Sequence, residues 1–324
     1  MTILKYIFRG MKKIWQVKRL ILILFLINFG LAYILGSTMK NILRDSLGHS
    51  AASRTMLENF DPHWYNHYVA SSKDNLGRTF SPSVVGIGAV LKGLDNFITG
   101  QITRNRPEIV GLGIIYMLLW IFFSPVFIHR FLAQKEEKLG YFQTGAKYFG
   151  RFLTLSAMTL ILYFLIVKFV GGFLGDWIKD MTRNMIDERP VFAWTVVGYL
   201  VVWTLIFSVN LVFDYTKIIT VHRDIKWVVF APVKGLGFVL GNLGRTIGIY
   251  LSLTILWIIL FGIYWLAAPG AGQSTTFAIW AAFTAGQIFV LLRIMLRAVY
   301  FGSECSFYES TVPEKAEETS EAGV

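Results

Sequence analysis

The 324-residue chain is 55% hydrophobic and only 16% charged, whereas soluble domains carry about 25% charged residues and disordered chains are poor in apolar ones, so the composition excludes both classes. The formal net charge of +11 comes from Lys and Arg that flank apolar runs and form no continuous basic stripe, which argues against nucleic acid as a partner. The single cysteine, Cys305, excludes an intrachain disulfide.

Apolar runs long enough to cross a bilayer predict an all-α polytopic membrane protein. A hydrocarbon core of about 30 Å needs roughly 20 mostly apolar helical residues. The first run follows a basic stretch, as in a signal peptide, but it is long for a signal and no small-residue cleavage site follows, so we interpret it as a retained helix. The predicted spans, paired as three helical hairpins, are 20–36, 109–131, 152–174, 191–213, 247–268 and 277–296.

The distribution of Lys and Arg predicts the topology, because basic segments resist translocation. The N-terminal segment and the second and fourth connections are basic, whereas the connection at 176–189 is slightly acidic and that at 269–276 is uncharged. Both termini are therefore predicted to be cytoplasmic. The tail at 310–324 is acidic and poor in apolar residues, which predicts a disordered segment.

Each basic segment contains an amphipathic stretch followed by Arg19, Arg151 or Arg245, which indicates a weak threefold repeat of hairpins. These stretches, at 1–19, 139–150 and 225–240, predict interfacial helices with the apolar face in the bilayer and the basic face toward anionic lipid. The alternative is a loop that packs on the cytoplasmic ends of the bundle. The candidate headgroup contacts are Arg9, Lys12, Lys13, Lys18, Arg19, Lys147, Arg151, Lys234 and Arg245.

The segment at 37–108 is too long for an unstructured loop and predicts a helical cap on the outer face, within a membrane domain that covers 20–309. Apolar residues recur at helical spacing over 38–60 and 81–102, and Asp61 followed by Pro62 is typical of a helix start. Such a cap commonly contacts a partner or shields a cavity.

His63 and His67 would share one face of that helix and could bind a metal with Asp61 as a third ligand. The alternative is a polar helix edge at the membrane surface, where Trp64, Tyr65 and Tyr68 would form an aromatic belt. We adopt the second interpretation, which predicts no metal and no cofactor.

Asp214 directly follows the fourth span, and Lys217 lies three residues later. A carboxylate at this boundary can pair with Lys217 or with a base on a neighbouring helix. It could act as a gate or proton site, or it could fasten the end of the helix. The structural or gating candidates are Asp214, Lys217, Arg223 and Asp224.

The motifs of catalysis are missing from the sequence. It contains no phosphate-binding glycine loop, no His-Glu-x-x-His and no nucleophile elbow, and the match at Gly235 and Gly237 is too short to count. Lys168, Arg293 and Arg297 lie within snorkelling reach of an interface, so the predicted span centres carry no charge. We therefore expect no enzymatic activity and no proton relay.

Two parts of the sequence carry a family resemblance. The residues at 213–218, 222–224 and 241–245, with 45–50, Phe60, Asp61 and Trp64, resemble uncharacterised bacterial six-helix inner-membrane proteins. This resemblance implies an inner-membrane location and an amphipathic elbow before the fifth span, but no activity. The chain also looks loosely similar to the membrane domain of glycerophosphodiesterase-type proteins, which implies lipid association; their catalytic half has no counterpart here.

These observations favour an accessory or scaffold subunit of a membrane complex, with anionic lipids and other membrane subunits as partners. The alternative is a lipid or hydrophobic-solute transporter or channel component, because an apolar path needs no buried charge. A membrane enzyme would need a reactive cluster that forms only in the fold, such as His63, His67 and Asp61.

Overall fold

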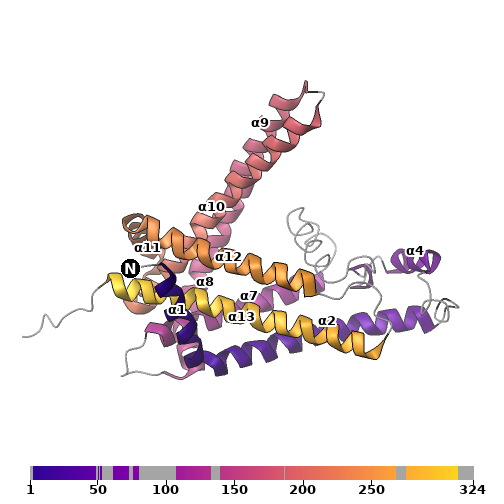
Figure 1. Cartoon of the computed structure of the whole chain (residues 1–324), viewed down its shortest axis with the longest axis horizontal. Helices are drawn as coiled ribbons and strands as arrows, with labels where there is room; N and C mark the ends of the chain where they lie inside the picture. The colour runs from indigo at the N-terminus through magenta and orange to yellow at the C-terminus, as the bar shows by residue number, and fades with distance from the viewer. Residues whose placement is uncertain are drawn as a thin grey trace, which may run out of the picture. The chain divides into compact units, whose positions relative to one another are not determined.

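The computed structural model describes residues 3–48, 50, 52, 61–72, 76–79, 107–132, 139–185, 187–267 and 275–312 (Figure 1). Within these residues every regular element is helical, which confirms the all-α prediction. Six helices are long and apolar enough to cross a membrane, and each coincides with one predicted span to within a residue at the span's ends or contains it whole. The predicted cap helix at 81–102 and tail residues 313–324 lie outside the described residues.

The elements follow one another in a simple order. The N-terminal part contains α1 (Ile3–Lys13), the 3-10 turn η1 (Ile14–Val17), α2 (Lys18–Gly48), α4 (Pro62–Ser71), η2 (Leu76–Thr79) and α7 (Pro107–Leu132). The middle contains α8 (Tyr141–Leu165), the π-helical η3 (Ile166–Gly171), α9 (Gly172–Thr182) and α10 (Glu188–His222). The remainder contains η4 (Val228–Phe230), α11 (Ala231–Gly241), α12 (Leu243–Ala267) and α13 (Thr276–Thr311).

Two of the three predicted amphipathic stretches form separate short helices, and one does not. The stretch at 1–19 forms α1 and η1, and the stretch at 225–240 forms η4 and α11. The stretch at 139–150 instead forms the first turns of α8, which continues past Arg151 without a break. No proline interrupts this helix, and the Gln143 side chain accepts a hydrogen bond from the Gly140 N–H at its start, 3.0 Å away.

Helices at both ends of the membrane domain are longer than predicted. The α2 helix continues from the first span to Gly48, so residues 38–48 extend that span and do not form a separate cap helix. Ser37 and Thr38 lie within this helix, and both hydroxyls donate to the Ile34 carbonyl, so neither competes for a backbone group outside the helix. At the other end α13 reaches Thr311 and includes the first residues of the predicted tail.

The chain divides into two compact units. The first comprises Met1–Val17, Leu118–Leu253 and Ala298–Val324, and the second comprises Lys18–Met117 and Thr254–Arg297. In the second unit, α12 and α13 pack through Tyr264 and Phe289, whose rings stack with centroids 4.1 Å apart. The α2 helix packs on α13 through Phe29 and Phe283, whose centroids are 6.3 Å apart.

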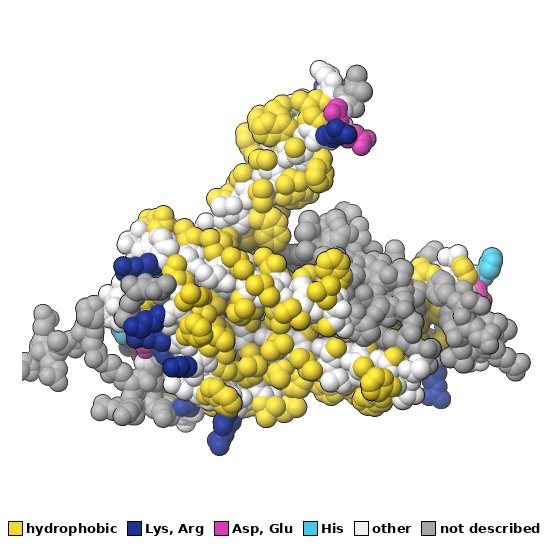
Figure 2. Space-filling view, in the orientation of Figure 1, with side chains coloured by type: hydrophobic (Ala, Val, Ile, Leu, Met, Phe, Trp, Pro, Cys, Tyr) yellow, Lys and Arg dark blue, Asp and Glu magenta, His cyan; other side chains and the backbone are white. Residues whose placement is uncertain are grey.

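The core of the first unit lies at one end of its helices, partly within and partly beyond the ends of the predicted spans. In α10 the buried side chains concentrate between Leu211 and Val221, and in α13 every side chain from Ala298 to Tyr308 is buried. The spans themselves expose most of their large apolar side chains, and Figure 2 shows hydrophobic side chains along the helices with charges near helix ends. Hydrocarbon solvates apolar side chains, so this pattern is the one expected of helices in lipid.

Candidate functional site

A buried ion pair lies at the end of α10. The Asp214 side chain is almost fully shielded from solvent, and its Oδ1 lies 2.8 Å from Nζ of Lys217, three residues further along the helix. Of the two partners considered for Asp214, Lys217 or a base on a neighbouring helix, the structure has Lys217. An ionised carboxylate is costly to bury without a partner, and Lys217 supplies one for the Asp214 side chain.

A second buried acid, Glu304 on α13, is 1% exposed and was not predicted. It follows the predicted sixth span, where a charged residue on the way to an acidic tail is normally solvated. Its neighbours Ser303 and Cys305 are fully buried as well. The run of small and apolar residues from Ala298 to Phe307 around this single acid is the signal that could have indicated burial.

Aromatic rings from three helices pack beside these residues. The Phe238 ring of α11 lies between Tyr215 of α10 and Tyr308 of α13, with centroid distances of 5.1 and 5.2 Å. The Phe307 ring also contacts Phe238, at 5.9 Å. This aromatic cluster joins α10, α11 and α13 and keeps water away from the adjacent core.

Gly235 explains why α11 can approach α10 so closely. A Cβ at this position would lie 2.1 Å from Oγ1 of Thr216 and 2.9 Å from the Val212 carbonyl oxygen. At Gly237 an added Cβ would meet no atom within 4 Å. The glycine at 235 therefore serves helix packing, and the two glycines do not form a phosphate loop.

Asp224 lies two residues after the end of α10 and is held by two cations of α8. Its backbone has φ 45°, the left-handed conformation that usually favours glycine. The Ile225 N–H donates to the Thr220 carbonyl at 3.1 Å and the Asp224 N–H to the Val221 carbonyl at 3.4 Å, which is the Schellman arrangement. The turn therefore requires an unusual backbone at Asp224, and an acidic residue occupies it.

The two cations that pair with the Asp224 side chain explain why an acid occupies this turn. Arg151 donates to Oδ1, and Nζ of Lys147 lies 3.3 Å from Oδ2. Burial raises the pKa of Asp224, but the hydrogen bonds and charges of Arg151 and Lys147 outweigh it, so the pKa lies below its ordinary value. Lys147 and Arg151 were predicted to contact lipid headgroups; in the structure they connect α8 to the end of α10.

The remaining candidates lie at several places. Arg223 is exposed and directly follows α10, where its N–H donates to the Ile219 carbonyl at 3.0 Å. Lys13 pairs with Glu309, at 2.8 Å between Nζ and Oε2. The other predicted headgroup contacts are exposed, on α1, at the start of α2, on α11 and at the start of α12: Arg9, Lys12, Lys18, Arg19, Lys234 and Arg245. Their contacts with lipid stay predictions.

His63 and His67 share the exposed face of α4, as their spacing predicts. The Asp61 carboxylate accepts hydrogen bonds from the N–H groups of His63 and Trp64, at 2.9 and 3.1 Å, and so caps the helix. Across the part of the chain that the structure describes, no three His, Cys, Asp or Glu side chains come close enough to hold a metal. Trp64 and Tyr68 are buried against Ala52, so these two rings do not form the predicted surface belt.

Comparison of the chain with protein-family models, with characterised proteins and with solved structures finds no match of any of the three kinds.

Proposed function

We propose that this protein is a non-enzymatic accessory or scaffold subunit of a bacterial inner-membrane complex. The observation that carries the proposal is a helical hairpin of the first unit, formed by α8, η3 and α9 on one side and α10 on the other. Over its outer half this hairpin offers apolar helix surface that no other described element of its unit covers.

The two arms of the hairpin pack on each other through small and aromatic side chains. Trp177 of α9 meets Trp194 of α10 edge to face, with centroids 5.7 Å apart, and Ile178 lies against Gly198. Among the described elements, α9 has extensive contacts only with η3 and α10 (Figure 1). The interface between the arms therefore uses one face of each helix and leaves the others open.

The open faces are rich in large apolar side chains. Those exposed on the hairpin include Phe164, Phe169, Phe173, Phe192, Tyr199, Leu200 and Trp203. Gly172 and Gly175 also face open space, since an added Cβ would meet nothing within 4 Å. In lipid, helices associate through close packing at small residues and not through the hydrophobic effect, so a second membrane protein could pack on this surface.

Blue-native electrophoresis after mild solubilisation tests the proposal. We expect the protein to migrate in an assembly larger than its own 36.8 kDa, and the double variant G172L/G175L to reduce that assembly. The matched control is G111L on α7, where an added Cβ also meets open space. Migration of the unaltered protein only as a free monomer would contradict the scaffold role.

A second candidate, a lipid or solute transporter, is favoured by the two buried carboxylates. Asp214 and Glu304 are each 1% exposed, and acids inside a membrane protein often belong to ion or substrate paths. Reconstituted vesicles would then show flux that E304Q lowers. Absence of flux from vesicles that contain folded protein would remove this candidate.

A further inference from the structure

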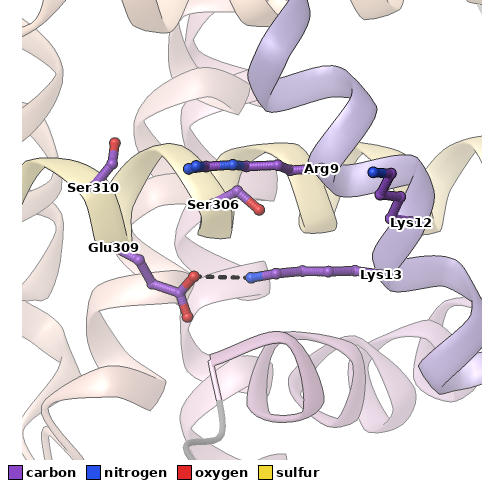
Figure 3. Close-up of a pocket in the computed structure, with 6 residues that line it drawn as sticks. All are labelled: Arg9, Lys12, Lys13, Ser306, Glu309 and Ser310. Atoms are coloured by element: carbon purple, nitrogen blue, oxygen red, sulfur yellow. Dashed lines mark hydrogen bonds and ion pairs between the residues drawn. The ribbon is translucent and has the colours of Figure 1, made fainter. Parts of the chain in front are cut away.

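A basic pocket lies where α1 crosses α13, within the first unit. It has a volume of about 440 Å³ and is lined by Arg9, Lys12 and Lys13 of α1 and by Ser306, Glu309 and Ser310 of α13 (Figure 3). The two helices are far apart in the sequence, so the pocket exists only in the folded chain.

Close backbone packing holds α1 against α13. A Cβ on Gly10 would lie 2.7 Å from the backbone nitrogen of Ser303, and a Cβ on Gly302 would lie 3.0 Å from Cα of Gly10. One turn away, Tyr6 packs edge to face on Phe307, with centroids 5.3 Å apart. The cations on the neighbouring face of α1 therefore have a defined position beside α13.

The charges of the pocket do not balance. Lys13 donates to Glu309 and to the Phe131 carbonyl, both at 2.8 Å, so it neutralises the acid and fastens the end of α7. Within the described residues no acidic side chain pairs with Arg9 or Lys12. Figure 3 shows Arg9 extended over Ser306 toward Ser310, with Lys12 on the next turn of the same helix. The pocket is thus a site of net positive charge.

The hydroxyl groups of the pocket are already engaged. Ser306 donates to the Gly302 carbonyl at 2.7 Å, and Ser310 donates to the Phe307 carbonyl at 2.8 Å. An anion in this pocket would therefore receive its hydrogen bonds from the guanidinium of Arg9 and the ammonium of Lys12. Arginine matches two phosphate oxygens at once, and lysine adds a point charge, so this pair suits a phosphate group.

An apolar stripe lies next to these cations and runs along α1 into η1. Leu4, Phe8, Met11 and Trp15 recur every three or four residues and are 46 to 76% exposed. At about 100° per residue, Arg9 lies about 130° and Lys12 about 70° around the helix from the centre of that stripe. A helix of this kind lies in the boundary of a bilayer with its apolar stripe among acyl chains, which brings its cations to the depth of lipid phosphates.

We propose that this pocket binds a phosphate group, with Arg9 and Lys12 as its ligands. A lipid headgroup and free phosphate share this chemistry, and the experiment below separates them. The site does not depend on the scaffold role, because its geometry lies in α1 and α13 and the hairpin takes no part in it.

Native mass spectrometry of the full chain in detergent, with added phosphatidylglycerol or phosphatidylcholine, tests the site. We expect preferential retention of phosphatidylglycerol and about a tenfold loss of affinity in the R9Q/K12Q variant, because two charge-assisted donors are removed. The control is K226Q/K234Q, which removes two exposed cations beside the apolar surface of α11 and should change affinity less than about twofold. Equal retention by both double variants would overturn the proposal.

Inorganic phosphate distinguishes the two sources. If millimolar phosphate displaces the lipid, and phosphate itself binds in a way that R9Q/K12Q abolishes, the ligand of the pocket is free phosphate. If the lipid is retained in phosphate buffer, the ligand is the lipid headgroup. The E309Q variant tests the site through a gain, since it releases Lys13 toward the anion and should tighten binding about threefold. Unchanged or weaker binding by folded E309Q would count against the pocket.

Discussion

The inner end of the first unit buries charged and polar side chains, whereas its outer hairpin exposes apolar ones. The inner end, where α10 and α13 continue beyond their predicted spans, buries Asp214 and Glu304 together with aromatic rings and Thr hydroxyls. The outer half of the hairpin, around η3 and α9, is strongly apolar yet exposes Phe169 and Phe173. In this chain, exposure of apolar side chains marks the segments that lipid can solvate, and burial marks segments where helices must cover one another.

The same difference predicts which substitutions should affect folding and which should affect association. A substitution at the inner end removes a partner from a closed core, and its free-energy cost should be large. A similar change on the hairpin exchanges one solvated side chain for another and should affect association more than folding.

The largest effect on stability is expected for Lys217→Met. This change leaves the Asp214 carboxylate buried without its ion-pair partner, which costs about 3 kcal/mol of unfolding free energy. Denaturant unfolding in detergent measures it. The matched control is Lys179→Met on α9, an exposed cation whose loss should cost less than about 0.5 kcal/mol. Equal costs for the two variants would show that the inner end is not a closed core.

A smaller effect is expected for Gly235→Ala. The new Cβ meets Thr216 and the Val212 carbonyl, so α11 must shift, at a cost of about 2 kcal/mol. Gly237→Ala on the same helix enters open space and should stabilise the helix by up to about 1 kcal/mol. Thermal unfolding of both variants gives the comparison, and a stable Gly235→Ala protein would mean that α10 and α11 are not in backbone contact.

The smallest effect is expected for Asp224→Asn, and it depends on pH. The pKa of Asp224 is lower in the folded protein than the ordinary 3.8, so its ion pairs stabilise the fold above that value and are lost as pH falls through the folded pKa. The side chain is 47% exposed, so the contribution at neutral pH is no more than about 1 kcal/mol.

Unfolding of Asp224→Asn across the acidic range measures this contribution. Asparagine tolerates the left-handed backbone, so the variant removes the charge without adding strain at the turn. Asp176→Asn on α9 is the control, since Asp176 lies in the exposed half of the hairpin. If Asp224→Asn loses as much stability in acid as the unaltered protein, other carboxylates cause that loss.

Local interactions were predictable because their partners are close in the sequence. Hydropathy predicted the six spans, since each apolar run is itself long enough to cross the hydrocarbon core. The spacing of Asp214 and Lys217 allowed the pair that the structure has, since residues three apart share a helix face. Asp61 before Pro62 predicted the start of α4, because both residues act on their own helix end.

The sequence by itself thus determined the helical class, the membrane spans and the contacts within single helices. Only the tertiary structure decided that Glu304 is buried, that Lys147 and Arg151 hold Asp224, and that Gly10 brings the cations of α1 onto α13. Each of these features depends on segments that come together from different parts of the chain. Hydropathy and spacing describe one helix at a time, and the face that a helix presents to its neighbour depends on packing that neither quantity contains.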